Sequence, residues 1–114
     1  MNSKWTVVGG VVCFLGVCLG AFGAHVLEDL LTRLDTVGTW ETGVKYLFFH
    51  GLAIVLAGVS SESAGAAWWN RAARAWCLGV ILFSGSLFGL ALGGPRWLGP
   101  VTPVGGVLFL VGWV

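Results

Sequence analysis

Charged residues are scarce in this sequence. Among its 114 residues, only 10% are Asp, Glu, Lys or Arg, whereas 57% are hydrophobic. Soluble domains carry about 25% charged residues, so this chain lacks the polar surface that covers a globule in water. The mean hydropathy of +0.91 indicates lipid as the surrounding medium. We therefore expect an integral membrane protein whose first partner is the lipid bilayer.

Other missing features narrow the class of protein further. No segments alternate between apolar and polar residues, as the strands of a transmembrane barrel would. The net charge is +1 and no run of Lys or Arg is present, so no surface for nucleic acid is expected. The three cysteines lie in apolar runs without a CxxC spacing, which favours packing residues over a disulfide or a metal site. Neither a phosphate-binding loop nor a nucleophile elbow is present, and we expect no enzyme activity and no cofactor.

The apolar runs predict an all-α fold, a bundle of four transmembrane helices forming a single domain over residues 1–114. A helix crosses the hydrocarbon in roughly 20 residues, so the chain has room for four spans with short connections. The last span is short and must be tilted or buried by its neighbours. The predicted spans are residues 5–27, 42–59, 73–92 and 99–114.

Between the first two spans, the segment HVLEDLLTRLDTVGTW predicts a short amphipathic helix that lies in the membrane interface. Its leucines recur at helical spacing, opposite charged residues such as Glu28 and Asp29. Trp40, at its end, suits the aromatic belt of a membrane protein. Four spans place both termini on one side of the membrane, and the acidic first loop favours the cytoplasm for the termini.

Small residues recur every four positions in two of the predicted spans. This spacing keeps them on one helix face, where two helix backbones can approach closely in lipid. We interpret them as packing residues within one bundle, with a dimer interface as the alternative. These residues are Gly16, Gly20, Ala24, Gly85, Gly89 and Gly93.

Polar side chains within the spans are predicted to gather in the half of the bilayer that faces the first and third loops. Tyr46 lies one helical turn before His50 on the same face. An ionisable group inside a membrane is by default a functional hypothesis. A proton relay through Tyr46 and His50 is one interpretation, and a polar clamp between packed helices is the one we favour. The candidate cluster comprises His25, Tyr46, His50, Ser84, Ser86 and Thr102.

His25 ends the first apolar run, in the stretch GAFGAH. We expect it to act as a helix-end group that anchors the acidic loop. Together with Glu28 or Asp29 it offers too few ligands for a divalent ion, so no metal site is predicted.

Four motifs, taken in order, resemble the small four-span family known as domain of unknown function 423, whose animal relatives are called transmembrane protein 256. The motifs are GAFGAHVL, WETGVKYLFFHGLAIVL, LFSGSLFGLAL and LGPVTPVGGVLFLVGW. The family pattern maps onto Gly20, Gly23, Ala24, His25, Tyr46, His50, Gly85, Ser86, Thr102, Pro103, Gly105, Gly106, Gly112 and Trp113. This chain has Leu47 where the family usually has glutamine, and Phe88 where it often has tyrosine. The resemblance implies a multi-pass inner or plasma membrane protein of unknown role.

Two functions follow as hypotheses. The first is a non-enzymatic accessory or structural subunit that packs against other membrane proteins or against a second copy of itself. The alternative is a homo-oligomeric transporter or channel that passes protons or a small solute along His25, Tyr46 and His50.

Overall fold

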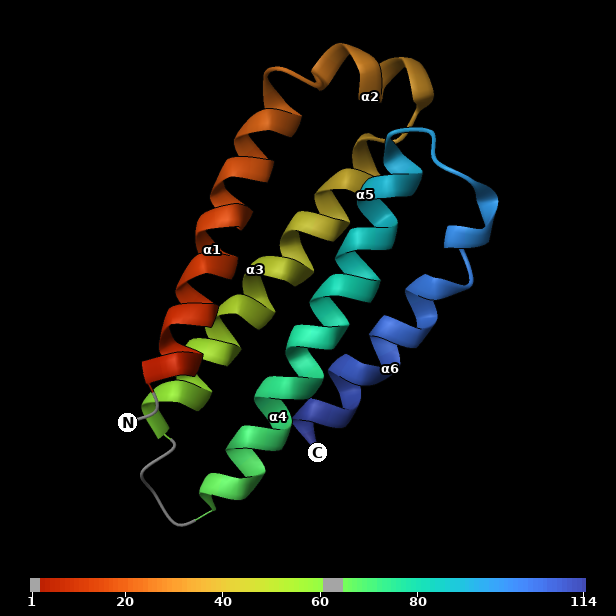
Figure 1. Cartoon of the computed structure of the whole chain (residues 1–114). Helices are drawn as coiled ribbons and strands as arrows, with labels where there is room; N and C mark the ends of the chain where they lie inside the picture. Colours follow the sequence, from red (N-terminus) through yellow and green to blue (C-terminus); the bar gives the residue numbers. More distant parts are fainter. Residues whose placement is uncertain (1–2, 61–64) are drawn as a thin grey trace.

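The computed structural model describes residues 3–60 and 65–114. Throughout these two ranges the chain forms helices joined by turns, without a strand, which confirms the all-α class. The elements are α1 (Ser3–Ala24), α2 (Glu28–Leu34), α3 (Val37–Ser60), α4 (Ala66–Gly79), the π-helical segment η1 (Val80–Ser84), α5 (Gly85–Ala91), the 3-10 helix η2 (Arg96–Leu98) and α6 (Val101–Trp113) (Figure 1).

Three of these helical stretches are long and apolar enough to cross a membrane. They are Lys4–Ala24, Val37–Ser60 and Ala66–Ala91, with 21, 24 and 26 residues. At 1.5 Å per residue, each is about as long as the 30 Å hydrocarbon core or longer. The helix α6 has 13 residues and is about 20 Å long. Length and composition therefore give three candidate spans among the described residues.

Two helix boundaries near the first loop differ from those predicted. The first helix ends at Ala24, so His25 lies in the following turn and not in a helix. Asp35 takes a left-handed conformation (φ 56°), and this ends α2 at Leu34. The second long helix then begins at Val37. A separate short helix therefore exists, but it spans only seven residues.

Trp40 lies inside α3 instead of at the end of the short helix. It is 4% exposed and packs with Leu31 of α2 and Ala91 of α5. Its indole N–H donates a hydrogen bond to the carbonyl of Leu19 on α1 at 2.9 Å. The tryptophan thus joins the helices at this end of the molecule.

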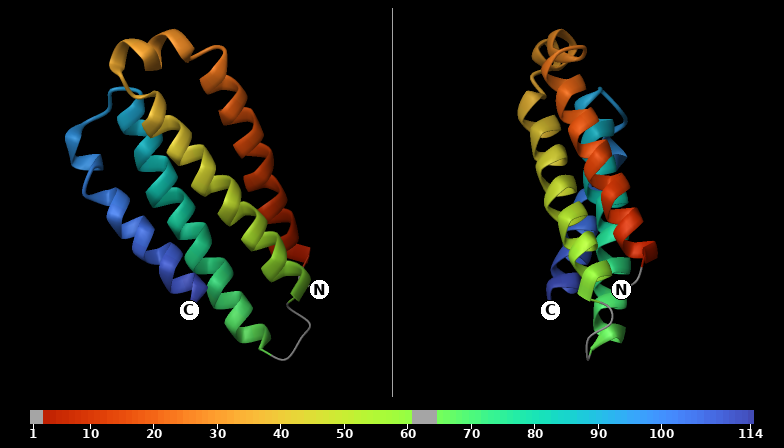
Figure 2. Two further views of the ribbon diagram at one scale, coloured as in Figure 1. Left: turned by 180° about the vertical axis from the view of Figure 1, so that it is seen from behind. Right: turned by 90° about the vertical axis from the view of Figure 1, so that its left-hand side faces the viewer.

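The long helices form one open, slightly staggered layer (Figure 2). In this layer α1 packs along α3, α3 along α4 and η1, and α4 along α6. The molecule measures 50 × 27 × 15 Å, and a helix with its side chains is about 10–12 Å across. The molecule is therefore much thinner in one direction than in the other two. The start of α1 and the end of α6 both lie toward the end of the layer opposite α2 (Figure 1).

Glycines allow α1 and α3 to lie close together. A Cβ atom added to Gly9 would lie 2.6 Å from the backbone nitrogen of Val55, and one added to Gly16 would lie 2.8 Å from the Phe48 ring. Gly23 faces the Trp40 indole in the same way. These three glycines are seven residues apart, a repeat typical of nearly parallel helices that cross at about +20°.

The same repeat occurs on two other helices. On α3, Gly51 contacts Val12 and Cys13, and Gly58 contacts Thr6, all of them on α1. On α6, Gly105 lies against the backbone of Phe83, and Gly112 lies against the Trp76 indole. These close contacts on α1, α3 and α6 thus follow a spacing of seven, which differs from the spacing of four that we predicted.

Of the small residues predicted to pack on α1, Gly16 lies in the contact with α3. A Cβ atom added to Gly20 would lie 3.6 Å from the Val44 side chain. Ala24 is exposed. Later in the chain, Gly89 lies against Leu98 of η2.

Gly85 has no neighbour within 4 Å of an added Cβ, and Gly93 has a positive φ (88°) in the turn after α5.

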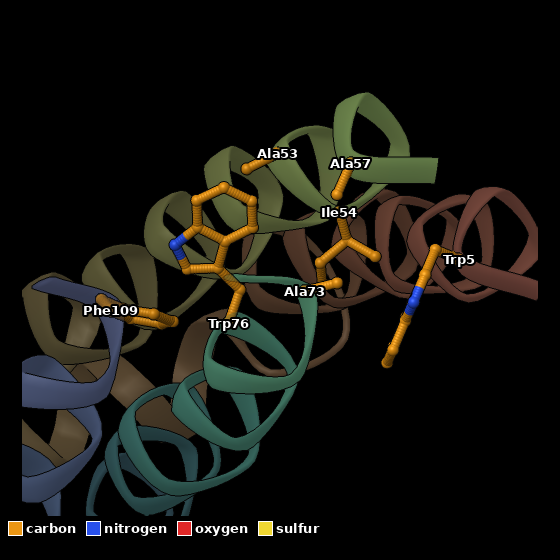
Figure 3. Close-up of a cluster of buried hydrophobic side chains, with 7 residues drawn as sticks. All are labelled: Trp5, Ala53, Ile54, Ala57, Ala73, Trp76 and Phe109. Atoms are coloured by element: carbon orange, nitrogen blue, oxygen red, sulfur yellow. The ribbon is translucent and has the colours of Figure 1, made fainter. Parts of the chain in front are cut away.

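The main hydrophobic core lies where α1, α3, α4 and α6 meet (Figure 3). Trp76 and Ile54 lie at its centre, surrounded by small alanines that let the helices approach. The indole N–H of Trp5 donates a hydrogen bond to Asn70, which ties the start of α1 to α4. The core therefore lies toward the end of the layer that holds the two termini.

Candidate functional site

His50 lies near the middle of α3 and is 5% exposed. Its ring stacks on Phe109 of α6, with the ring centroids 3.7 Å apart and the planes 9° from parallel. Trp76 and Trp113 complete the aromatic surroundings, with centroids 6.4 and 6.0 Å from the imidazole. The imidazole is therefore enclosed between α3, α4 and α6.

Both nitrogens of the His50 ring are hydrogen bonded. Nδ1 lies 2.8 Å from the backbone carbonyl of Tyr46, and Nε2 lies 3.0 Å from Nε1 of Trp113. A carbonyl can only accept a hydrogen bond and an indole N–H can only donate one. His50 is therefore neutral, with its proton on Nδ1 and its lone pair on Nε2 facing Trp113.

This arrangement bears on the proton-relay interpretation. A second proton on Nε2 would point at the Trp113 N–H, so the bond between α3 and α6 would have to open before His50 could accept it. The other bond runs to the carbonyl of Tyr46, and not to its hydroxyl. The geometry is that of a clamp between two helices.

Ser84, the last residue of η1, is fully buried. Its hydroxyl donates a 2.8 Å hydrogen bond to the carbonyl of Gly43 on α3. Gly43 itself lies against the Phe88 ring, which occupies the space that a Cβ would need. The π-helical turn thus places a polar group against the neighbouring helix.

Ser86 joins α5 to the start of α6. Its hydroxyl lies 2.9 Å from the Phe83 carbonyl and 2.5 Å from the hydroxyl of Thr102. A hydroxyl has one hydrogen to give, so Ser86 donates to the carbonyl and accepts from Thr102. Ser86 and Thr102 therefore form a second polar contact, separate from that of His50.

Of the remaining two candidates, Tyr46 lies beside His50 and His25 lies apart from the others. Tyr46 is 38% exposed, and its ring centroid lies 5.1 Å from that of Phe83 and 6.3 Å from that of His50. His25 is exposed in the turn between α1 and α2. His50 is 13 residues from the start of α3, about 20 Å along the helix from that end. The structure thus places the six candidates in four separate surroundings.

The hydrogen-bond partner of His50 was not predicted from the sequence. Trp113 lies 63 residues away and donates from the last turn of α6, near the end of the layer that holds the termini. We expected the polar groups near His50 to lie in the half of the bilayer that faces the first and third loops instead. The available signal was the Gly-Trp pair at positions 112 and 113 in the fourth motif.

The GAFGAH stretch borders a pocket of 400 Å³ between α1, α2 and α3. Gly20 and Gly23 form part of its wall, and Leu31 and Trp40 form part of the buried side. Glu28, Glu41 and Lys45 also line this pocket.

Comparisons with known proteins agree with the membrane character of the fold. The profile of the family described as protein of unknown function (DUF423) matches residues 19–106. The chain is 41% identical over 110 residues to a UPF0382 membrane protein of Staphylococcus epidermidis, covering 95% of this chain and 87% of that protein. It is 42% identical over 110 residues to a UPF0382 membrane protein of Staphylococcus haemolyticus, with the same coverage.

A further relative is the UPF0382 inner membrane protein YgdD of Escherichia coli K12. It is 41% identical over 114 residues, covering 99% of this chain and 86% of that protein. No solved structure matches the chain. These relatives, together with three helices of spanning length, confirm the predicted location in a cell membrane.

Proposed function

Because the chain belongs to the family of proteins of unknown function DUF423, a family of membrane proteins, we propose that it is a non-enzymatic accessory subunit packing against another membrane protein. The observation that carries the proposal is the open layer of helices. In a layer 15 Å thick, the long helices keep apolar side chains on the outside. Such a shape offers surfaces to a neighbour and encloses little volume of its own.

The outer face of α1 supports the proposal. Val7, Val11 and Phe14 lie on this face, and Phe14 is 67% exposed. They follow one another at four and three residues, the same seven-residue rhythm as the glycines on the inner face. A partner helix packed on this stripe would therefore lie nearly parallel to α1.

The test compares two pairs of substitutions on exposed apolar positions. We expect the chain, extracted in a mild detergent, to migrate on a native gel as a complex larger than one copy. Val11→Trp with Phe14→Ala changes the α1 stripe and releases the single chain. Phe49→Ala with Leu52→Trp makes the same exchange on exposed positions of α3 and leaves the complex intact.

The result against this proposal is a single copy of the chain for the unchanged protein, both in detergent and by photobleaching in a bilayer. Mass spectrometry of the complex separates the two kinds of partner. A second protein present in fixed ratio supports the accessory role, and a complex of this chain alone supports self-association.

The alternative function, a transporter or channel for protons or a small solute, would use His25, Tyr46 and His50. It predicts proton flux in vesicles that contain the purified chain and a pH-sensitive dye. The accessory role predicts flux no greater than in empty vesicles. Flux that His50→Asn abolishes, while the variant remains folded, would favour the transporter.

The proposal includes four membrane crossings, with α2 in the interface and both termini in the cytoplasm. It is supported by α6, which packs along α4, and by α2, where Leu31 is buried while Glu28 and Asp29 are exposed. In a variant without native cysteines, Asp29→Cys should react with an impermeant maleimide on intact cells. Ala66→Cys should react only after the membrane is opened. The reverse pattern would invert the orientation.

A further inference from the structure

A second pocket, with a volume of 450 Å³, lies between the first turns of α4 and the last turns of α6. Its walls include the indoles of Trp68, Trp69, Trp76 and Trp113, together with Arg71. We propose that this pocket binds one anionic phospholipid, with the phosphate at Arg71 and the glycerol ester region against the tryptophans. The accessory role proposed above does not depend on this site.

The indole N–H of Trp76 is the first observation in favour of a ligand. Trp76 is 1% exposed, and its Nε1 has no hydrogen-bond partner among the residues that the structure describes. By contrast, the indoles of Trp5, Trp40 and Trp113 all donate to an acceptor within the protein. A buried donor without an acceptor is rare, and it indicates that the acceptor comes from elsewhere.

The Trp76 side chain borders the pocket. Its nitrogen lies against Gly112, so closely that a side chain at this position would collide with it. Trp76 and Gly112 both line the pocket. The proposal places an oxygen atom of the lipid beside Gly112 as the acceptor of this hydrogen bond.

Arg71 supplies the charge that selects an anionic ligand. Its guanidinium carbon lies 5.1 Å from the centre of the Trp68 ring, a cation–π contact that holds the charge beside the pocket. Arg71 precedes Trp76 by five residues, about 7.5 Å along the helix. Since α4 begins at Ala66, Arg71 is nearer the membrane surface and Trp76 is deeper.

A phospholipid has matching groups in the same order. Its phosphate lies at the surface, its ester carbonyls lie deeper, and its acyl chains continue into the hydrocarbon. The deeper carbonyl is the acceptor that Trp76 lacks, and the indole rings suit the interface between headgroups and chains. A free phosphate ion would satisfy Arg71 but leave the tryptophan walls without an apolar partner. Basic pockets between membrane helices are known to hold anionic headgroups in this way.

The experiment measures retained lipid by native mass spectrometry of the whole chain in a non-ionic detergent. The probes are phosphatidylglycerol and phosphatidylcholine with identical acyl chains. We expect phosphatidylglycerol to be retained about fivefold better, the effect of one arginine beside an anionic headgroup. Arg71→Gln should abolish this preference. Arg74→Gln is the matched control, because Arg74 is exposed on the same helix but does not line the pocket.

A second variant tests the deeper contact. Trp76→Phe removes the N–H and should weaken retention of both lipids alike, because both carry ester carbonyls. Equal retention of the two lipids by the unchanged protein would overturn the proposal. Loss of the preference in Arg74→Gln as large as that in Arg71→Gln would do the same. So would full displacement of phosphatidylglycerol by inorganic phosphate, which would reveal a site for a free anion.

Discussion

The glycines between α1 and α3 allow a comparison of two neighbouring substitutions, Gly9→Ala and Gly10→Ala. The two residues are adjacent in the same helix. An added Cβ at Gly9 would lie 2.6 Å from Val55 and 2.8 Å from the carbonyl of Gly51, whereas one at Gly10 would have no neighbour within 4 Å. We expect Gly9→Ala to destabilise the fold and Gly10→Ala to leave its stability equal or slightly higher.

The size of the difference follows from the geometry. Ordinary contact begins at 3.4 Å, so α1 and α3 must separate by about 0.8 Å at Gly9 (3.4 minus 2.6 Å). The obstructing atoms at Gly9 include backbone atoms, which cannot turn aside as a side chain would. Overpacking of this kind costs about 1–3 kcal/mol. Replacing a helical glycine by alanine stabilises by roughly 0.5–1 kcal/mol, but this gain is common to both variants and cancels in their difference.

The assay is equilibrium unfolding in mixed micelles, with sodium dodecyl sulfate as denaturant and circular dichroism as the signal. The free energies of unfolding of the two variants should differ by about 1–3 kcal/mol, with Gly9→Ala the less stable. If the two differ by less than about 0.5 kcal/mol, the typical range for surface substitutions, the close contact between α1 and α3 is refuted.

Three further predictions concern the polar groups. Trp113→Phe removes the indole donor and should destabilise the fold. A double-mutant cycle with His50→Phe, measured by SDS unfolding, should give a coupling energy between the two residues of about 0.6–1.7 kcal/mol. A coupling energy of zero would contradict the hydrogen bond. Ser84→Ala removes the hydroxyl that donates to the Gly43 carbonyl and should lower the free energy of unfolding by about 1 kcal/mol in the same assay. An unchanged free energy of unfolding would mean that another donor satisfies this carbonyl. In a variant without native cysteines, His25→Cys should react rapidly with a polar maleimide in the folded state, whereas a slow reaction would mean that this turn is covered.

Much of the fold is predictable because the hydrophobic effect acts on composition. Apolar runs of spanning length identify the long helices, and the glycine-proline turn after α5 ends the third helical stretch close to residue 92, where we placed it. The start of α3 was missed because it depends on one backbone conformation. Asp35 adopts a left-handed φ that no periodicity reveals, and the chain re-enters a helix two residues later.

The helix faces were harder to predict than the helices. A glycine every four residues and a glycine every seven are both present in the first helix, and the sequence does not say which face meets a neighbour. Which glycines lie in a contact depends on the side chains of the neighbouring helix, where Val55 and Trp40 lie opposite Gly9 and Gly23. In the third stretch, the π-helical turn at Val80–Ser84 shifts the later residues around the helix axis, and a regular 3.6-residue repeat cannot anticipate such a shift.

The candidate site, like the fold, could be predicted from the sequence only in part. That His50 needs partners inside the protein follows from the low polarity of its surroundings, and the sequence was sufficient for this. Which partner it takes depends on how far α6 lies along α3, and this places Trp113 opposite Nε2. Ser86 and Thr102 did come together, because a short turn connects their helices.

The arrangement of the helices in a row has a consequence for how the protein is made. The contact between α1 and α3 needs only residues that leave the ribosome early, and the contact between α4 and α6 needs only those that leave it late. Each helical hairpin can therefore complete its own glycine contacts as soon as its second helix has been synthesised. The two hairpins then join where α3 meets α4, η1 and α5, and through the hydrogen bonds of Trp5 with Asn70 and of His50 with Trp113.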